Sequence, residues 1–147
     1  MSAPDLAAPL RAAILADSGI ASQLPTFKSA PAVFTRRPVP KEAPYPMIVI
    51  SPDITNIDNG GLDNTQLVIQ RDVTVYGQNE EAADYRLVET LAWALRDLFH
   101  QERNAITVTG WCVASLSCAG PRIAPTDDDH STGRLITVTA RLARLEA

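Results

Sequence analysis

The fold is decided by two adjoining segments, QLVIQRDVTVY at residues 66–76 and EEAADYRLVETLAWALRDLFHQE at residues 80–102. In the first segment apolar and mixed residues alternate, which is typical of a strand with one covered face. The second segment predicts a long helix, because its apolar residues form a continuous stripe. This stripe contains Leu87, Val88, Leu91, Ala92, Leu95, Leu98 and Phe99. We therefore predict a half-covered sheet with a long helix packed on it.

Three further strands are expected around this pair. The run Met47-Ile48-Val49-Ile50 is almost uninterruptedly apolar, as in a strand that is covered on both faces or central in a sheet. After the helix, residues 106–118 and 134–145 have the composition of two long strands, separated by prolines and by Asp127-Asp128-Asp129. We expect an α+β fold, with a mainly antiparallel sheet of about four strands packed by the long helix.

The N-terminal part adds a shorter helix and an extended arm. Residues 6–17 carry apolar side chains at helical spacing, with Asp5 available as the N-cap, and one further helical turn is expected at residues 20–24. Residues 25–46 hold six of the eleven prolines, which remove backbone donors and favour an extended arm or an edge hairpin. We expect residues 1–147 to form a single domain, with this arm lying on that domain or on a neighbouring subunit.

Composition and charge narrow the class of protein. The chain has 147 residues, of which 46% are hydrophobic and 20% are charged, so wholesale disorder is not expected. Its net charge of −4 disfavours a protein that grips nucleic acid through phosphate contacts. The N-terminus lacks the basic and apolar regions of a secretion signal, and no apolar run approaches the length needed to span a bilayer. We expect a cytoplasmic product.

The sequence carries no catalytic constellation, and it predicts neither a cofactor nor a metal site. His100 lies near the end of the long helix, where an imidazolium would complement the helix dipole, and no nucleophile can be nominated beside it. Asn59-Gly60-Gly61 lacks the lysine and the glycine spacing of a phosphate loop. The acidic turn before His130 lacks the spacing of an EF-hand, so a solvated loop is favoured over a metal site or a charged contact.

The tryptophans and cysteines are predicted to serve packing. Trp93 and Trp111 fall within regular elements, which favours core positions over platforms for a ligand. Cys112 and Cys118 are six positions apart on one predicted strand, so both should point to one face, with Cα atoms on the order of 20 Å apart. Because a disulfide needs Cα atoms within about 7 Å, we predict two free thiols that act as small buried side chains.

Three segments are candidates for contacts in an assembly. The proline-rich arm holds the only adjacent basic pair of the chain. Residues 53–64 are rich in turn formers, and we expect this loop to be flexible in the free subunit and ordered against a neighbour. The acidic turn should stay at a wet surface, either the lumen of a ring or a contact with basic groups. The candidate interface or lumen residues are Arg36, Arg37, Asn59, Gly60, Gly61, Asp127, Asp128 and Asp129.

The order of these segments resembles that of a known family. The segments are LRAAILAD at 10–17, PYPMIVI at 44–50, VTVYG at 73–77, the long helix, and a final strand at 133–143. Taken in order over most of the chain, they resemble the tail-completion, or tail-terminator, proteins of long-tailed bacteriophages and gene transfer agents. The resemblance implies no catalytic residues and no cofactor.

The resemblance does imply a place in an assembly. A subunit of this family would form a hexameric ring on the head-proximal end of the tail tube, in the neck of the virion, after assembly in the host cytoplasm. Its partners would be copies of itself, the tail tube protein and the head–tail connector, with DNA passing through the ring without specific binding and no membrane involved. A neck adaptor protein, or a small cytosolic ligand-binding domain, is an alternative.

Overall fold

The main sheet is built from six strands. The computed structural model describes residues 4–35, 39–51, 55–58, 66–78, 82–126 and 131–145. Within these residues β5 (Thr55–Asp58) pairs with β6 beside β4, and the other five strands follow one order. This order is β3 (Val33–Phe34), β4 (Met47–Ile50), β6 (Gln66–Gln78), β8 (Ser131–Arg144) and β7 (Trp111–Ile123). Every pair except β3–β4 is antiparallel, which confirms the predicted α+β class with two strands more than expected. One of these, β5, occupies residues 55–58, so the prediction of a loop is wrong for this part of residues 53–64.

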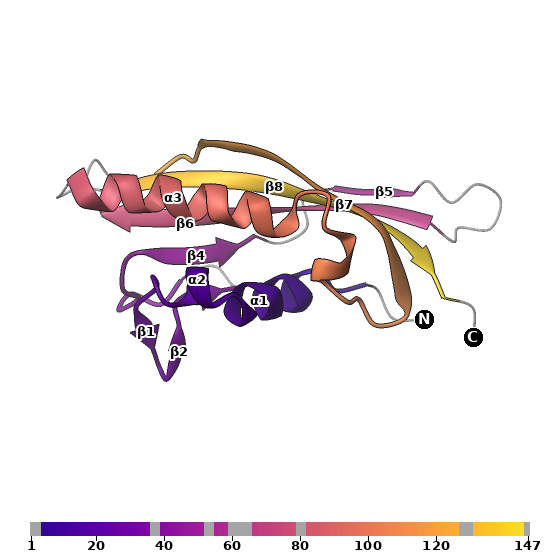
Figure 1. The fold of residues 1–147 in the computed structure, drawn as a ribbon, viewed down its shortest axis with the longest axis horizontal. Helices are drawn as coiled ribbons and strands as arrows, with labels where there is room; N and C mark the ends of the chain where they lie inside the picture. The colour runs from indigo at the N-terminus through magenta and orange to yellow at the C-terminus, as the bar shows by residue number, and fades with distance from the viewer. Residues whose placement is uncertain are drawn as a thin grey trace.

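The helices cover one face of this sheet. α1 (Ala7–Ala16) and α3 (Ala82–Phe99) both lie on the same side of the strands (Figure 1). The predicted N-cap Asp5 accepts a hydrogen bond from the backbone N–H of Ala7 at 2.9 Å. Asp17 ends α1 and caps the short α2 (Ser18–Ala21), because its carboxylate accepts the N–H of Ile20 at 3.1 Å. The first predicted helix is therefore present, and the further helical turn lies at residues 18–21, earlier than the predicted 20–24.

The core lies between these helices and the sheet. β6 and β8 pair over their full length, from Gln66 with Ala143 to Gln78 with Ser131. Every second residue of each strand faces the helices, and these side chains join the apolar stripe of α3 in one cluster. From the strands the cluster takes Ile69, Val73, Val75, Ile136, Val138, Ala140 and Leu142, and from α3 it takes Val88, Leu91, Ala92, Leu95 and Phe99. The alternation predicted for residues 66–76 is confirmed.

The strand predicted at residues 106–118 is displaced along the chain. β7 begins at Trp111 and ends at Ile123, whereas residues 103–105 form a 3-10 turn, η1 (Arg103–Ala105). Ile106 and Val108 are buried, but they fill the end of the core from a turn. Gly110 has a φ of 84° there, a backbone shape that suits glycine, and the chain reverses into β7 at this point. The apolar residues that suggested a longer strand are thus core residues of a loop.

A bulge in β7 reverses its facing pattern. The register of β7 against β8 shifts between Val113 and Ser115. Before the shift Trp111 faces the core, and after it Leu116 and Cys118 do. Cys112 is consequently exposed while Cys118 is buried, so the prediction that both thiols share one face is wrong, and the predicted burial is wrong for Cys112. Both cysteines are free, as predicted.

The proline-rich segment packs on the opposite face of β4. All four residues of β4 are buried, which confirms a strand covered on both sides. Ile48 and Ile50 belong to the main core, whereas Met47 and Val49 join a second, smaller cluster with Ala32 and Ala43. Within this segment β1 (Thr26–Phe27) pairs with β2 (Ala30–Pro31), and the chain then continues into β3 at the edge of the sheet.

Truncation of the α3 stripe should destabilise the fold. Leu91 and Leu95 are fully buried, so Leu91→Ala or Leu95→Ala should each lower the free energy of unfolding by roughly 2–5 kcal/mol. Chemical denaturation with urea measures this directly. Arg86→Ala on the exposed side of the same helix is the control, and it should stay within about 0.5 kcal/mol of the wild type. Wild-type midpoints for both leucine variants would contradict the packing described.

The two thiols should react at very different rates. Burial raises the pKa of Cys118 to about 11, although the nearby Arg96 guanidinium lowers it. Because the thiolate is the reactive form, a thiol reagent at pH 8 should label Cys112 and leave Cys118 unmodified in the folded chain. Cys112→Ser removes the fast reaction and Cys118→Ser leaves it unchanged. Rapid labelling of two thiols in the native protein would contradict the bulge.

Candidate functional site

The eight residues singled out as interface or lumen candidates lie outside the described residues: Arg36, Arg37, Asn59, Gly60, Gly61, Asp127, Asp128 and Asp129. The described residues next to them still separate two of the segments. Gln66, after the glycine-containing loop, pairs with Ala143, whereas Ser131, after the acidic turn, pairs with Gln78. These ends of β6 are roughly 40 Å apart, at about 3.3 Å per residue. The described residues that follow the two segments therefore lie at opposite ends of β6.

The outer edge of β7 is covered over residues 116–120 by the C-terminal end of α3 and the turn that follows it. The Arg96 guanidinium donates hydrogen bonds to the carbonyl oxygens of Cys118 at 3.4 Å and Gly120 at 2.6 Å. The Gln101 N–H donates to the Leu116 oxygen at 2.8 Å. Gly120 has a φ of 98°, and a Cβ there would lie 2.9 Å from the Leu135 oxygen, so only glycine fits this close approach.

His100 completes this cover in a role that differs from the predicted one. Its Nδ1 accepts the backbone N–H of Cys118 at 3.0 Å, so the imidazole acts as an acceptor that ties helix to strand. The expected structural use of His100 is present, but through this hydrogen bond. An open strand edge can pair with another chain. Over residues 116–120 of β7 this is prevented, because Arg96 of α3 and residues 100–101 of the following turn bond the outward-facing backbone groups.

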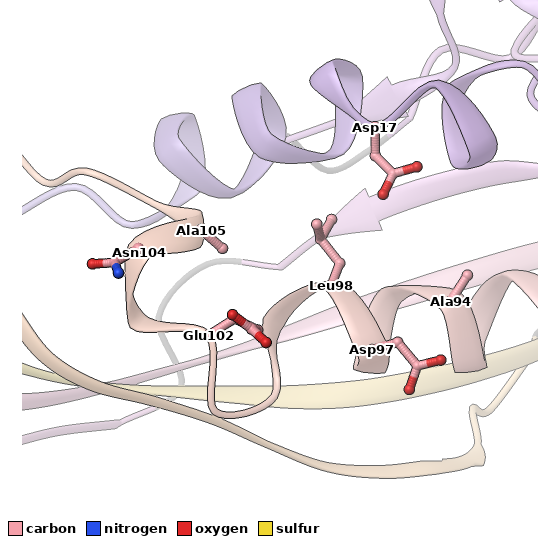
Figure 2. A pocket seen from close by; sticks show the side chains of 7 residues that line it. All are labelled: Asp17, Ala94, Asp97, Leu98, Glu102, Asn104 and Ala105. Atoms are coloured by element: carbon pink, nitrogen blue, oxygen red, sulfur yellow. The ribbon is translucent and has the colours of Figure 1, made fainter.

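An acidic hollow of about 600 Å³ opens between the helices. Figure 2 shows its lining, with Asp17 at the junction of α1 and α2, Leu98 reaching from α3 toward it, and Glu102 following α3. Ala94, Asp97, Asn104 and Ala105 complete the lining. Among the described residues the carboxylates of Asp97 and Glu102 make no hydrogen bond or ion pair. The hollow therefore presents uncompensated negative charge beside a small apolar surface.

A second hollow of about 610 Å³ continues along the outer side of α3 and contains Trp93. The two hollows share Ala94 and Asp97, and we call them together the α3 groove. Trp93 is 55% exposed, so its predicted core position is wrong, whereas Trp111 is 6% exposed and its predicted packing role is confirmed. Position 93 lies halfway between Leu91 and Leu95 on the helix, which puts it opposite their stripe. The helical period of the sequence therefore already places Trp93 on the exposed side of the helix.

Part of the opposite face of the sheet, over β6, β8 and β7, is polar and exposed. We call it the hydroxyl face, and it contains Gln70, Asp72, Ser115, Ser117, Thr137, Thr139 and Arg141, all of them partly or fully exposed. Thr137 donates to the Asp72 carboxylate at 2.6 Å, and the Arg122 guanidinium donates to the Thr137 hydroxyl at 2.8 Å. Arg122 also lies 3.7 Å from the Asp72 carboxylate, so these two charges compensate each other.

Arg141 is the uncompensated charge of the hydroxyl face. It is exposed, and it pairs in register with Val68 on one side and Ser115 on the other. Within the described part of the chain its guanidinium makes no hydrogen bond or ion pair. Its neighbours on β7 and β8 have small hydroxyl side chains, so the longer Arg141 side chain extends beyond them.

Among the described residues, the open surfaces are better defined than any site for chemistry. No three His, Cys, Asp or Glu side chains among them are grouped so that they could hold a metal ion. No described helix combines the length and the apolar character needed to cross a membrane. The arrangement is one of two dissimilar open surfaces, the α3 groove and the hydroxyl face, on opposite sides of one core.

Comparison with known proteins gives a structural match only. No protein-family model and no curated protein sequence matches the chain. Among solved structures, a chain of the "Virion of native gene transfer agent (GTA) particle" has the same fold, with a TM-score of 0.71. The match covers 94% of this chain and 94% of that chain, at 14% sequence identity. At this identity the similarity establishes a shared fold over nearly the whole length of both chains.

Removal of the Arg96 side-chain bonds should loosen the edge of β7. Arg96→Met takes away both donors to the Cys118 and Gly120 oxygens, and we expect a loss of about 1–3 kcal/mol in the free energy of unfolding. Hydrogen exchange should accelerate at residues 116–120 before it does in β6. Arg86→Met, on the same helix without such bonds, is the control. Unchanged exchange in β7 would mean that Arg96 does not hold this edge.

Proposed function

We propose that this chain is a structural virion subunit that forms a ring at the head-proximal end of a tail tube. There it ends polymerisation of the tube and provides the joint to the head connector. The observation that carries the proposal is the full-length structural match to a chain of a gene transfer agent virion. The match spans 94% of each chain, so it concerns the arrangement of the whole subunit.

The surfaces of the subunit support association through unlike patches. A ring requires head-to-tail contacts, in which one surface of each copy meets a different surface of the next. The α3 groove and the hydroxyl face are two such surfaces, one on the helix side and one on the open side of the sheet. Residues 116–120 of β7 cannot pair with a strand of another copy, because their outward backbone groups are already bonded. Contacts between copies at this edge would therefore be made by side chains.

The charge of the chain suits a ring around DNA. Each copy carries a net charge of −4, so a hexamer would carry six times this value, −24. Such a ring would let a polyanion pass without adhesion. Asp127, Asp128 and Asp129 are candidates for the lumen in this arrangement, and a contact with basic groups of an adjoining ring is the other use of the same charges.

A neck adaptor that joins the portal to the tail is the second candidate. The same structural match fits it, because the match concerns a virion chain and leaves the position in the particle open. The two proposals differ in the partner. A terminator binds the end of the tail tube, whereas an adaptor binds the portal side and leaves the length of the tube unchanged.

Electron microscopy of purified protein mixed with tail tubes tests the proposal. We expect a ring at one end of each tube and no further growth of capped tubes when tube subunits are added. Binding only to portal complexes would assign the adaptor role. A monomer that binds neither tubes nor portals would overturn both.

Deletion of the gene for this protein should uncouple heads from tails. We expect tubes of abnormal or excessive length and filled heads without tails, because growth of the tube would have no stop and no joint. Thin-section and negative-stain microscopy of lysates measure both features, and expression of the intact chain from a plasmid is the control. Joined particles with tubes of normal length after deletion would contradict the proposed role.

A further inference from the structure

The α3 groove and the hydroxyl face are matched in charge. Asp97 and Glu102 are exposed in the groove, and Arg141 is exposed on β8, the middle strand of the hydroxyl face. None of these three side chains makes a hydrogen bond or an ion pair among the described residues. The groove also contains the exposed Arg86, but its lining is net negative, whereas the open charge of the hydroxyl face is positive. Opposite charge on two surfaces of one chain favours contact between copies in a head-to-tail sense.

The two surfaces also agree in length and relief. α3 has 18 residues, which gives a length of about 27 Å at 1.5 Å per residue. From Cys112 to Ala119 the open face of β7 extends on the order of 25 Å at about 3.3 Å per residue. On the helix side Trp93 lines the groove and is 55% exposed, and β7 presents the exposed residues Ser115, Ser117 and Ala119, whose small side chains leave room for an indole ring. Exposed tryptophans of this kind often anchor protein interfaces.

We propose that the α3 groove of one copy docks on the hydroxyl face of the next copy, with Asp97 facing Arg141 and Trp93 packing over Ser115 and Ser117. This inference rests on the proposed ring function and names the two surfaces that close the ring. Because every copy uses both surfaces, a closed ring gains one contact per subunit and leaves neither surface open. The contact is made by side chains, in agreement with the blocked edge of β7.

Charge reversal tests the pairing in the full-length chain. Arg141→Glu and Asp97→Arg each place like charges opposite each other, and we expect the subunit concentration for half-assembly to rise by at least about tenfold in each case. Mass photometry and sedimentation velocity measure the ring and the monomer. Arg141→Lys keeps the charge at the same position and is the control, and it should assemble like the wild type.

The single variants provide a sharper experiment when they are mixed. In a mixed ring, the carboxylate introduced by Arg141→Glu meets the guanidinium introduced by Asp97→Arg. At every other contact the unchanged Arg141 of the second variant meets the unchanged Asp97 of the first. An equimolar mixture should therefore form rings of the wild-type mass with the two variants alternating, although neither variant assembles alone. The double variant, Arg141→Glu with Asp97→Arg, should assemble within about threefold of the wild-type concentration. Both positions are exposed, so thermal unfolding of the monomers should match the wild type.

The outcomes separate this inference from the function on which it rests. Rings that survive both single reversals, or single variants that fail to recover on mixing, overturn the pairing of these surfaces and leave the ring function standing. A wild-type chain that forms no ring, either alone or on tail tubes, overturns the ring function itself. Recovery in the mixture and in the double variant supports the proposed contact.

Discussion

The packing of α3 on the paired strands β6 and β8 is the constraint from which the rest of the structure follows. A single stripe of apolar residues on α3 is buried against every second side chain of these two long strands. Burial of this kind is the main favourable term in folding, at roughly 25 cal/mol per Å² of apolar surface. Because the helices bury one face of β6, β8 and β7 in the core, polar side chains can occupy the exposed part of the other face. The hydroxyl face is thus a consequence of where α3 lies.

The end of α3 and the turn after it determine which edge of the sheet can pair with another strand. Arg96, His100 and Gln101 satisfy the outward backbone groups of β7, and β3 at the opposite side is only two residues long. Open strand edges are templates for uncontrolled pairing, so their cover favours a subunit that associates through defined side-chain surfaces. In the proposed ring, partner choice would rest on charge and on the relief of two faces. Such contacts give orientation, which a ring needs in order to close.

The functional surfaces were harder to foresee than the fold. The sequence drew attention to glycine, arginine and aspartate clusters, because these composition signals stand out along a chain. The α3 groove draws on Asp17 from the junction of two short helices and on Glu102 beyond the long one, residues far apart in sequence. The hydroxyl face depends on the register of three strands, and Arg141 is distinguished only by the neighbours that β6 and β7 place beside it. Only the exposure of Trp93 could have been predicted from the sequence, since the helical period places it opposite the buried stripe.

The sequence by itself determined the α+β class, the strand at 66–76, the doubly covered strand at 47–50 and the buried face of the long helix, because each rests on a local period of two or 3.6 residues. Tertiary structure alone decided the course of β7. Ile106 and Val108 look like strand residues but fill the core from a turn, and the bulge after Val113 sends Cys112 to solvent and Cys118 inward. No local period marks a bulge, since it arises where the strand must stay paired with β8 while the end of α3 fixes its outer edge. The cover of that edge joins residues 96–101 to residues 116–120, and this long-range contact exists only once the helix has packed on the sheet.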